Sequence, residues 1–255
     1  MMDIRVIKAI YKKDLKEILS LTTVKYSFIF FPVVFLFIML IVIYFTYNSL
    51  IAQGSIQNAT SAAKNLEIFS YISTSYLIFF GIIPLSLAST ISSYSIVGEK
   101  TQRTIEPILA TPVEDSELFI GKMLAPFIPT IITTYIVLGF YTLFVDYLSL
   151  RLGGIVFPNY AWYSIVILFI PFSTILMILL TLVFSSRAMD PRSAQQFSSI
   201  ILIPLLIIFI LGIVIYTLTS LLIVIMSIIV ILSDIVVYKF ALKIFNREII
   251  VSRWK

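Results

Sequence analysis

Long apolar segments dominate this chain of 255 residues and constrain its fold more than any other feature. Six of them are long enough to cross a bilayer, which takes about 20 mostly apolar residues in a helix. They are residues 27–47, 69–97, 120–145, 161–184, 198–219 and 221–245. Because lipid offers no partner for free backbone N–H and C=O groups, such segments form helices. The sequence therefore predicts an all-α integral membrane protein with six transmembrane helices.

Composition agrees with this prediction and excludes several kinds of chemistry. Hydrophobic residues make up 60% of the chain and charged residues 12%, whereas soluble domains carry about a quarter charged residues. The mean hydropathy is +1.08. The chain has no Cys and no His, which removes thiolate metal sites, disulfides and the commonest metal ligand and general base. We expect no metal site, no bound cofactor, no nucleic-acid partner and no catalysis by the chain itself.

The positions of the basic residues predict the orientation in the membrane. With six spans both termini lie on one side, and all but two of the 18 Lys and Arg residues fall on that side. The exceptions are Lys64 and Arg151. By the positive-inside rule both termini are cytoplasmic. The predicted segments of this single transmembrane domain are 1–26 (amphipathic helix), 27–97 (spans one and two), 98–119 (coupling loop), 120–184 (spans three and four), 185–197 (connector), 198–245 (spans five and six) and 246–255 (tail).

The N-terminal segment, residues 1–26, has the pattern of a helix that lies on a membrane surface. Apolar side chains recur at helical spacing from Ile4 through Tyr11 to Ile18. Six basic residues, among them Lys12 and Lys16, lie in this segment, from Arg5 to Lys25. Such a pattern predicts an amphipathic interfacial helix that anchors the chain on the cytoplasmic side.

The longest polar interruption lies between spans two and three, at residues 98–122. Thr111, Pro112 and Glu114 have the order of a capping box, which predicts that a helix begins there and continues into span three. Acidic residues outnumber basic ones in this loop, which does not suit an anchor on an anionic leaflet. A protein partner on the cytoplasmic side is the better explanation.

Two polar features lie inside the predicted spans. Ser86, Ser89, Thr90 and Ser93 share one face of span two and fit either a helix–helix contact or a water-filled passage. Asp234 is the one acid well inside a span, and an intramembrane carboxyl indicates a functional site. A structural ion pair with Lys239 or Lys243 and a position at a water-filled vestibule stay open as alternatives. Hydroxyls and carboxyl together are our candidates for the lining of a transport pathway.

The sequence contains no G-x-x-x-x-G-K-[ST] phosphate loop, no G-x-S-x-G elbow and no H-E-x-x-H motif. The chain is therefore not expected to hydrolyse ATP in the usual way. The loop sequence EKTQRTIEPILATPV (99–113), followed by Gly121 and Lys122, resembles the signature of the ABC-2-type permeases, the membrane subunits of ATP-driven exporters. A second segment, SSRAMDPRSAQQ (185–196), resembles that family's connector between spans four and five. One departure is Arg103, where the family usually has Gly.

The resemblance implies an exporter permease in the cell membrane that works as a homodimer or heterodimer. It also implies a separate cytoplasmic ATPase, which would use ATP and Mg, and it leaves the cargo open among lipid-like, drug-like and peptide molecules and sodium. The implied ATPase-coupling residues are Glu99, Lys100, Thr104, Ile105, Glu106, Pro107, Leu109, Thr111 and Pro112. The implied connector residues are Arg187, Asp190, Pro191 and Arg192. A different class of function stays open from the residues alone, namely an ATP-independent channel or secondary transporter that uses Asp234.

Overall fold

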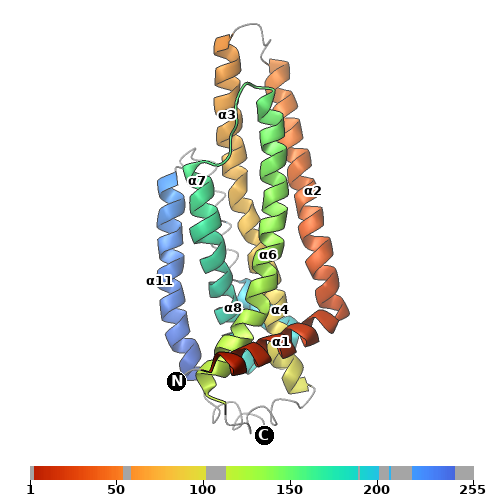
Figure 1. Ribbon diagram of the computed structural model, residues 1–255, viewed down its shortest axis with the longest axis vertical. Coiled ribbons are helices and arrows are strands. Elements are labelled where there is room, and N and C mark those ends of the chain that lie inside the picture. Colours follow the sequence, from red (N-terminus) through yellow and green to blue (C-terminus); the bar gives the residue numbers. More distant parts are fainter. Residues whose placement is uncertain are drawn as a thin grey trace.

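The computed structural model describes residues 3–53, 59–101, 113–188, 190–200, 207 and 220–244, and every regular element within them is helical. The long helices run along one axis and form an elongated bundle, and α1 lies across one end of it, here called the α1 end (Figure 1). In chain order the elements are α1 (Ile4–Ser20), α2 (Thr22–Gln53), α3 (Ala59–Leu77), η1 (Ile78–Gly81), α4 (Ile82–Thr101), α6 (Asp115–Leu150), α7 (Tyr160–Tyr163), η2 (Ser164–Phe169), α8 (Ile170–Arg187), α9 (Pro191–Ser199) and α11 (Ser220–Ile244).

Five helical stretches are long and apolar enough to cross a membrane: Val24–Ala52, Ala63–Ser95, Ser116–Leu150, Tyr160–Ser185 and Ile223–Ala241. They correspond to five of the six predicted spans and confirm an all-helical membrane fold. The predicted fifth span, 198–219, lies outside the described residues except for 198–200 and Ile207. The count of six therefore stays a prediction, as does the cytoplasmic position of both termini.

Two of the spans contain short irregular helices, and each is followed closely by a proline. Pro84 follows the 3₁₀ turn η1, and Pro171 follows the π-helical turn η2. Proline lacks an N–H, so the carbonyl four residues earlier loses its α-helical donor and the local winding can change. The two turns pack together, because a Cβ added at Gly81 would lie 2.6 Å from the Phe169 ring. The Tyr135 hydroxyl also donates to the Val166 carbonyl in the π turn (2.8 Å).

The described residues form one large apolar core, a smaller one nearer the α1 end, and a third cluster of four buried residues that includes Ile18 and Val24. The large core contains Phe69, Phe80 and Tyr141, and the Tyr141 hydroxyl donates to the Ser73 carbonyl (3.1 Å). The smaller core joins α4, α6, α8 and α11 through residues such as Phe119 and Met177. Large apolar side chains of α2, α6 and α11 stay exposed on the outside, as expected for surfaces that face lipid or another subunit.

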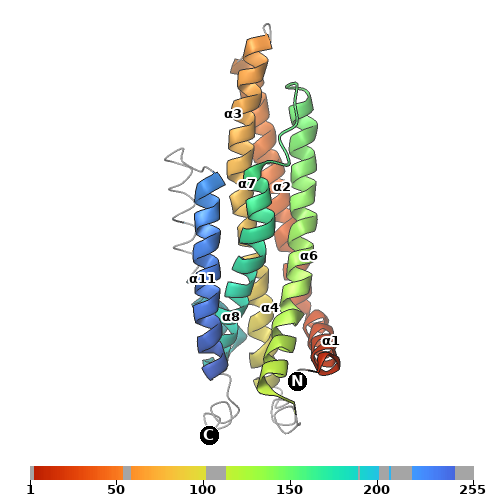
Figure 2. The ribbon, with the colours of Figure 1, turned by 60° about the vertical axis from the view of Figure 1, so that its left-hand side comes forward.

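The loop between α6 and α7 lies toward the end of the bundle opposite α1. The Asp146 carboxylate accepts the backbone N–H groups of Val156 (3.1 Å) and Phe157 (2.9 Å). Asn159 caps α7 by accepting from the Trp162 N–H, and its amide donates to the Thr74 hydroxyl (2.9 Å). These bonds fix the loop against α3. Figure 2 shows α2, α3 and α6 reaching further at this end than α7 and α11.

Candidate functional site

The α1 helix packs directly on the first turns of α6, the helix that follows the polar loop. The Asp3 carboxylate caps α1 by accepting the Arg5 backbone N–H (2.8 Å), and the backbone N–H of Asp3 donates to Glu117 Oε1 in the first turn of α6 (2.6 Å). At Gly121 a side chain would collide with α1, because an added Cβ would lie 2.7 Å from Ile10 Cγ2. The Gly at this position therefore permits the close approach of the two helices.

A buried ion pair lies beside this contact. Lys122 Nζ of α6 is 3.2 Å from Asp14 Oδ2 of α1, and the two side chains are 2% and 4% exposed. Lys13 Nζ lies 3.6 Å from the other carboxylate oxygen. The third helix, α4, contributes Ser95, whose hydroxyl and carbonyl make long contacts of 3.5 Å with Asp14 and Lys122. A buried pair of this kind favours the docking of α1 on α6 at this position, because either charge would be costly to bury without the other.

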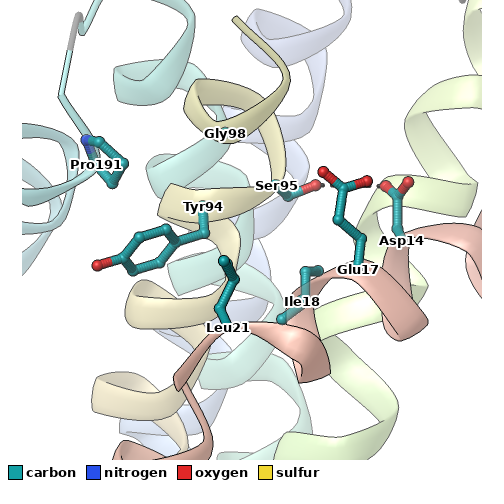
Figure 3. Close-up of a pocket in the computed structure, with 8 residues that line it drawn as sticks. All are labelled: Asp14, Glu17, Ile18, Leu21, Tyr94, Ser95, Gly98 and Pro191. Carbon is teal, nitrogen blue, oxygen red and sulfur yellow. Dashed lines mark hydrogen bonds between the residues drawn. The ribbon is translucent and has the colours of Figure 1, made fainter. Parts of the chain in front are cut away.

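A cavity of about 170 Å³ opens next to the ion pair, between α1, α4 and the start of α9. Figure 3 shows Asp14 and Glu17 projecting side by side from α1, with the Ser95 hydroxyl directed toward them. The rest of the lining comes from Ile18, Leu21, Tyr94, Gly98 and Pro191. The carboxylates of this cavity already have cationic partners, since Lys13 also lies 3.8 Å from Glu17.

The hydroxyl face of the second span packs on α9. The hydroxyls of Ser89 and Ser198 are 3.1 Å apart, and the Gln195 amide donates to the Thr90 hydroxyl (2.8 Å). Thr90 also donates to the Ser86 carbonyl, and Ser93 donates to the Thr90 carbonyl. In this chain these residues thus make a helix–helix contact, one of the two roles that the sequence allows. A pathway-lining role for Ser86, Ser89, Thr90 and Ser93 stays a prediction.

The predicted connector residues lie at the same end of the bundle. Asp190 occupies the N-cap position of α9 without a side-chain cap bond, and Pro191 is in its first turn, as is common for proline. Pro191 lines the cavity, and the side chain of Arg192 is exposed. Arg187 is the last residue of α8, and its side chain is outside the described part of the structure.

Most predicted ATPase-coupling residues lie outside the described residues, namely Thr104, Ile105, Glu106, Pro107, Leu109, Thr111 and Pro112. Glu99 and Lys100 belong to the last turn of α4, and their side chains are not described. One sequence prediction is wrong: Glu114 is not inside a helix. It has an extended backbone and is itself the N-cap residue of α6, which begins at Asp115. The capping-box order of Thr111 and Glu114 therefore does not mark the helix start.

Asp234 is separate from the cluster at the α1 end. It lies on α11, is 7% exposed and has no hydrogen-bond partner for either carboxyl oxygen among the described residues. The side chain of Lys239 is exposed, and no ion pair joins it to Asp234 within the described part of the chain. The ion pair with Lys239 is thus not formed, and the side chain of Lys243 lies outside the described residues. The described residues also contain no group of three or more acidic side chains that could hold a metal ion.

Comparison with known families decides the class of this helical bundle. Residues 8–247 match the model of a family described as ABC-2 family transporter protein. The chain belongs to the ABC-2 transporter family. It is therefore a membrane transport component, and the resemblance seen in the loop and connector sequences is confirmed. Comparisons with curated proteins and with solved structures gave no match.

Within the ABC-2 chain, the site residues that the sequence did not predict are Asp14 and Ser95, while Lys122 was noted only as part of the loop signature. The available signal was Asp14 itself. Asp14 lies on the same face of α1 as Ile7 and Ile18, and the other residues of that face are apolar. An acid on the apolar face of an amphipathic helix indicates a buried cationic partner. Nothing local points to Lys122, which lies 108 residues away.

Proposed function

We propose that this chain is the permease subunit of an ATP-driven exporter, with a translocation pathway formed by two such subunits and driven by a separate cytoplasmic ATPase. The observation that carries the proposal is the ABC-2 family match over residues 8–247. The sequence contains no phosphate-loop motif, which agrees with ATP hydrolysis by a separate subunit. The positive-inside rule makes the α1 end cytoplasmic.

The way α6 is built supports a mechanical role for the loop that precedes it. The helix is continuous for 36 residues from Asp115 to Leu150, a length of about 54 Å at 1.5 Å per residue. A push on residues 98–114 would therefore enter span three directly, up to the point where Pro126 and Pro129 interrupt its backbone hydrogen bonds. Rigid-body movement of helices is a common way to convert such a push into a change of state.

The N-terminal helix would move with α6 in this proposal. The Asp14–Lys122 pair and the contact between Ile10 and Gly121 join α1 to the first two turns of α6. The cytoplasmic module is then made of α1, the loop and the start of span three, and an ATPase would act on it as one body. The exposed apolar faces of α2, α6 and α11 supply surface for lipid and for the second subunit.

Glu106 in the loop gives the most direct test. We would purify the permease with its co-encoded ATPase, replace Glu106 with Lys, and measure complex formation and coupled ATP hydrolysis. A charge reversal at a docking contact should reduce both, because like charges then face each other. Glu67→Lys, the same change on an exposed residue of α3, is the control and should leave both unchanged. Normal assembly and normal coupled hydrolysis in Glu106→Lys would contradict the proposed role.

The same preparation separates the proposal from the ATP-independent alternative. In the proposed exporter, transport into proteoliposomes or vesicles stops when ATP is withheld. Transport that continues without ATP and is lost in Asp234→Asn would instead identify a channel or secondary transporter that depends on this carboxyl.

A further inference from the structure

Asp234 is the one ionisable residue in the buried stripe of α11. Ile223, Ser227, Val230, Asp234 and Ala241 are all buried, and their spacing of three, four or seven residues places them on one face. This face packs against α8 and the π turn η2, and both ribbons run beside α11 (Figures 1 and 2). The seam between α11 and α8 therefore contains a carboxyl group at a position where its neighbours on the stripe are small or apolar.

No described charge faces this carboxyl. The packed elements contribute few titratable groups: η2 has none, α8 has only Arg187 at its last residue, and α7 has Tyr160 and Tyr163 at the far end. The α6 helix meets α11 through Phe119 and Tyr238, whose ring centroids are 6.0 Å apart. On α11 itself, Lys239 is five residues further on and exposed, and Lys243 follows a full turn later.

A protonated Asp234 can donate a hydrogen bond within α11, whereas its carboxylate finds no donor there among the described residues. In the same helix Ser227 and Ser233 donate their hydroxyls to the carbonyls four residues earlier, both at 2.8 Å. A protonated carboxyl at position 234 has an O–H that can do the same toward Val230. A carboxylate only accepts hydrogen bonds, and the described residues offer it no donor. An unpaired charge at this depth is expensive.

We propose that Asp234 is a proton-binding site within the membrane bundle, and that its carboxyl holds a proton at neutral pH while α11 is packed on α8. Release of that proton requires water or another cation beside α11. Proton binding is therefore linked to closure of the seam, because a seam that opens to water favours the carboxylate, whereas the closed seam favours the neutral form. The inference concerns the subunit alone and does not rest on its coupling to an ATPase.

Infrared spectroscopy of the full chain in lipid nanodiscs tests the proposal without a need for reagent access. We expect a carbonyl-stretching band of a protonated carboxylic acid at neutral pH in the wild type. The band should be absent in Asp234→Asn and retained in Asp146→Asn, which alters another carboxyl near the end of a span. A wild-type spectrum without this band, or a band that Asp234→Asn leaves unchanged, would overturn the proposal.

Dicyclohexylcarbodiimide labelling of the wild type gives a second readout that needs no variant to fold. The acid proton moves to a carbodiimide nitrogen, the carboxylate oxygen bonds to the central carbon, and the acyl group then shifts to nitrogen as a stable N-acylurea. An ordinary aspartate is protonated in only about one molecule in a thousand at pH 7. We expect peptide mass spectrometry to show at least about tenfold more adduct on Asp234 than on Asp146. If the Asn variant does not assemble, the absence of both the wild-type band and the adduct decides against the site.

Discussion

Replacing Lys122 with Met tests whether the buried ion pair holds α1 on α6. The change removes the ammonium group, keeps a similar length, and leaves Asp14 buried without its closest partner at 3.2 Å. Two unit charges at that distance attract by about 5 kcal/mol at an effective dielectric constant of about 20. Loss of one member of a buried pair costs about 3–5 kcal/mol. Lys13, at 3.6 Å, offsets part of this, so we expect a cost of about 3 kcal/mol, or about 150-fold in the docking equilibrium.

A single introduced cysteine can report this equilibrium, because the chain has no Cys of its own. Position 10 is suitable, since Ile10 packs against Gly121 in the interface between α1 and α6. In Ile10→Cys, maleimide labelling measures how often α1 leaves α6. We expect the rate to rise by up to about 150-fold when Lys122→Met is added. The matched control is Lys64→Met, which removes an exposed Lys at the opposite end of the bundle and should leave the rate unchanged.

The double variant Asp14→Asn/Lys122→Met isolates the charge from the packing. It removes both ions, so no unpaired charge stays buried, and we expect it to recover most of the lost docking. A labelling rate in Lys122→Met within a few-fold of its parent would refute the reasoning. So would a double variant that labels as fast as Lys122→Met alone, because the cost would then come from the lost side-chain volume.

Two further substitutions test local geometry. Gly121→Ala should lower the thermal midpoint by overpacking against Ile10, at about 1–3 kcal/mol, while Gly139→Ala, with nothing within 4 Å of the added Cβ, should be neutral or slightly stabilising; equal effects would contradict the close approach. Asp146→Ala should speed hydrogen exchange of the Val156 and Phe157 amides, since each loses a bond of about 1 kcal/mol. Exchange rates like those of the wild type would show that Asp146 does not hold the loop.

Hydrophobicity alone predicted most of the fold because each span is a local property of the chain. Five of the predicted spans match helices that can cross a membrane, and α2 (Thr22–Gln53) extends beyond its predicted bounds of 27–47 at both ends. The irregular turns were not predicted. Pro84 and Pro171 gave a hint of changed winding, but whether a helix kinks, tightens or widens at a proline depends on neighbours such as Phe169 and Tyr135.

The candidate site was predictable only in part, because its main contacts join distant segments. Asp14 and Lys122 are 108 residues apart, and Ser89 and Ser198 are 109 apart. Periodicity shows that a helix face is buried without showing what covers it. The burial of Asp234 could be expected from its place in a span, yet its lack of a partner depends on how α11 turns relative to α8. The start of α6 was misplaced because a capping-box order is short enough to occur by chance just before a helix, and here Glu114 is itself the N-cap residue.

The π-helical turn η2 sets which side chains of the fourth span point toward each neighbouring helix. A π turn accommodates one residue more than an α turn, and each residue of an α-helix advances the face by about 100°. The two halves of the span therefore present different faces from those that an unbroken helix would present. Within the turn, Ile165 and Phe169 belong to the large core, and beyond it α8 serves both cores, with Ile170 and Leu176 in the large one and Met177 and Leu182 in the smaller one. The phase set at the turn therefore decides which α8 side chains reach each core.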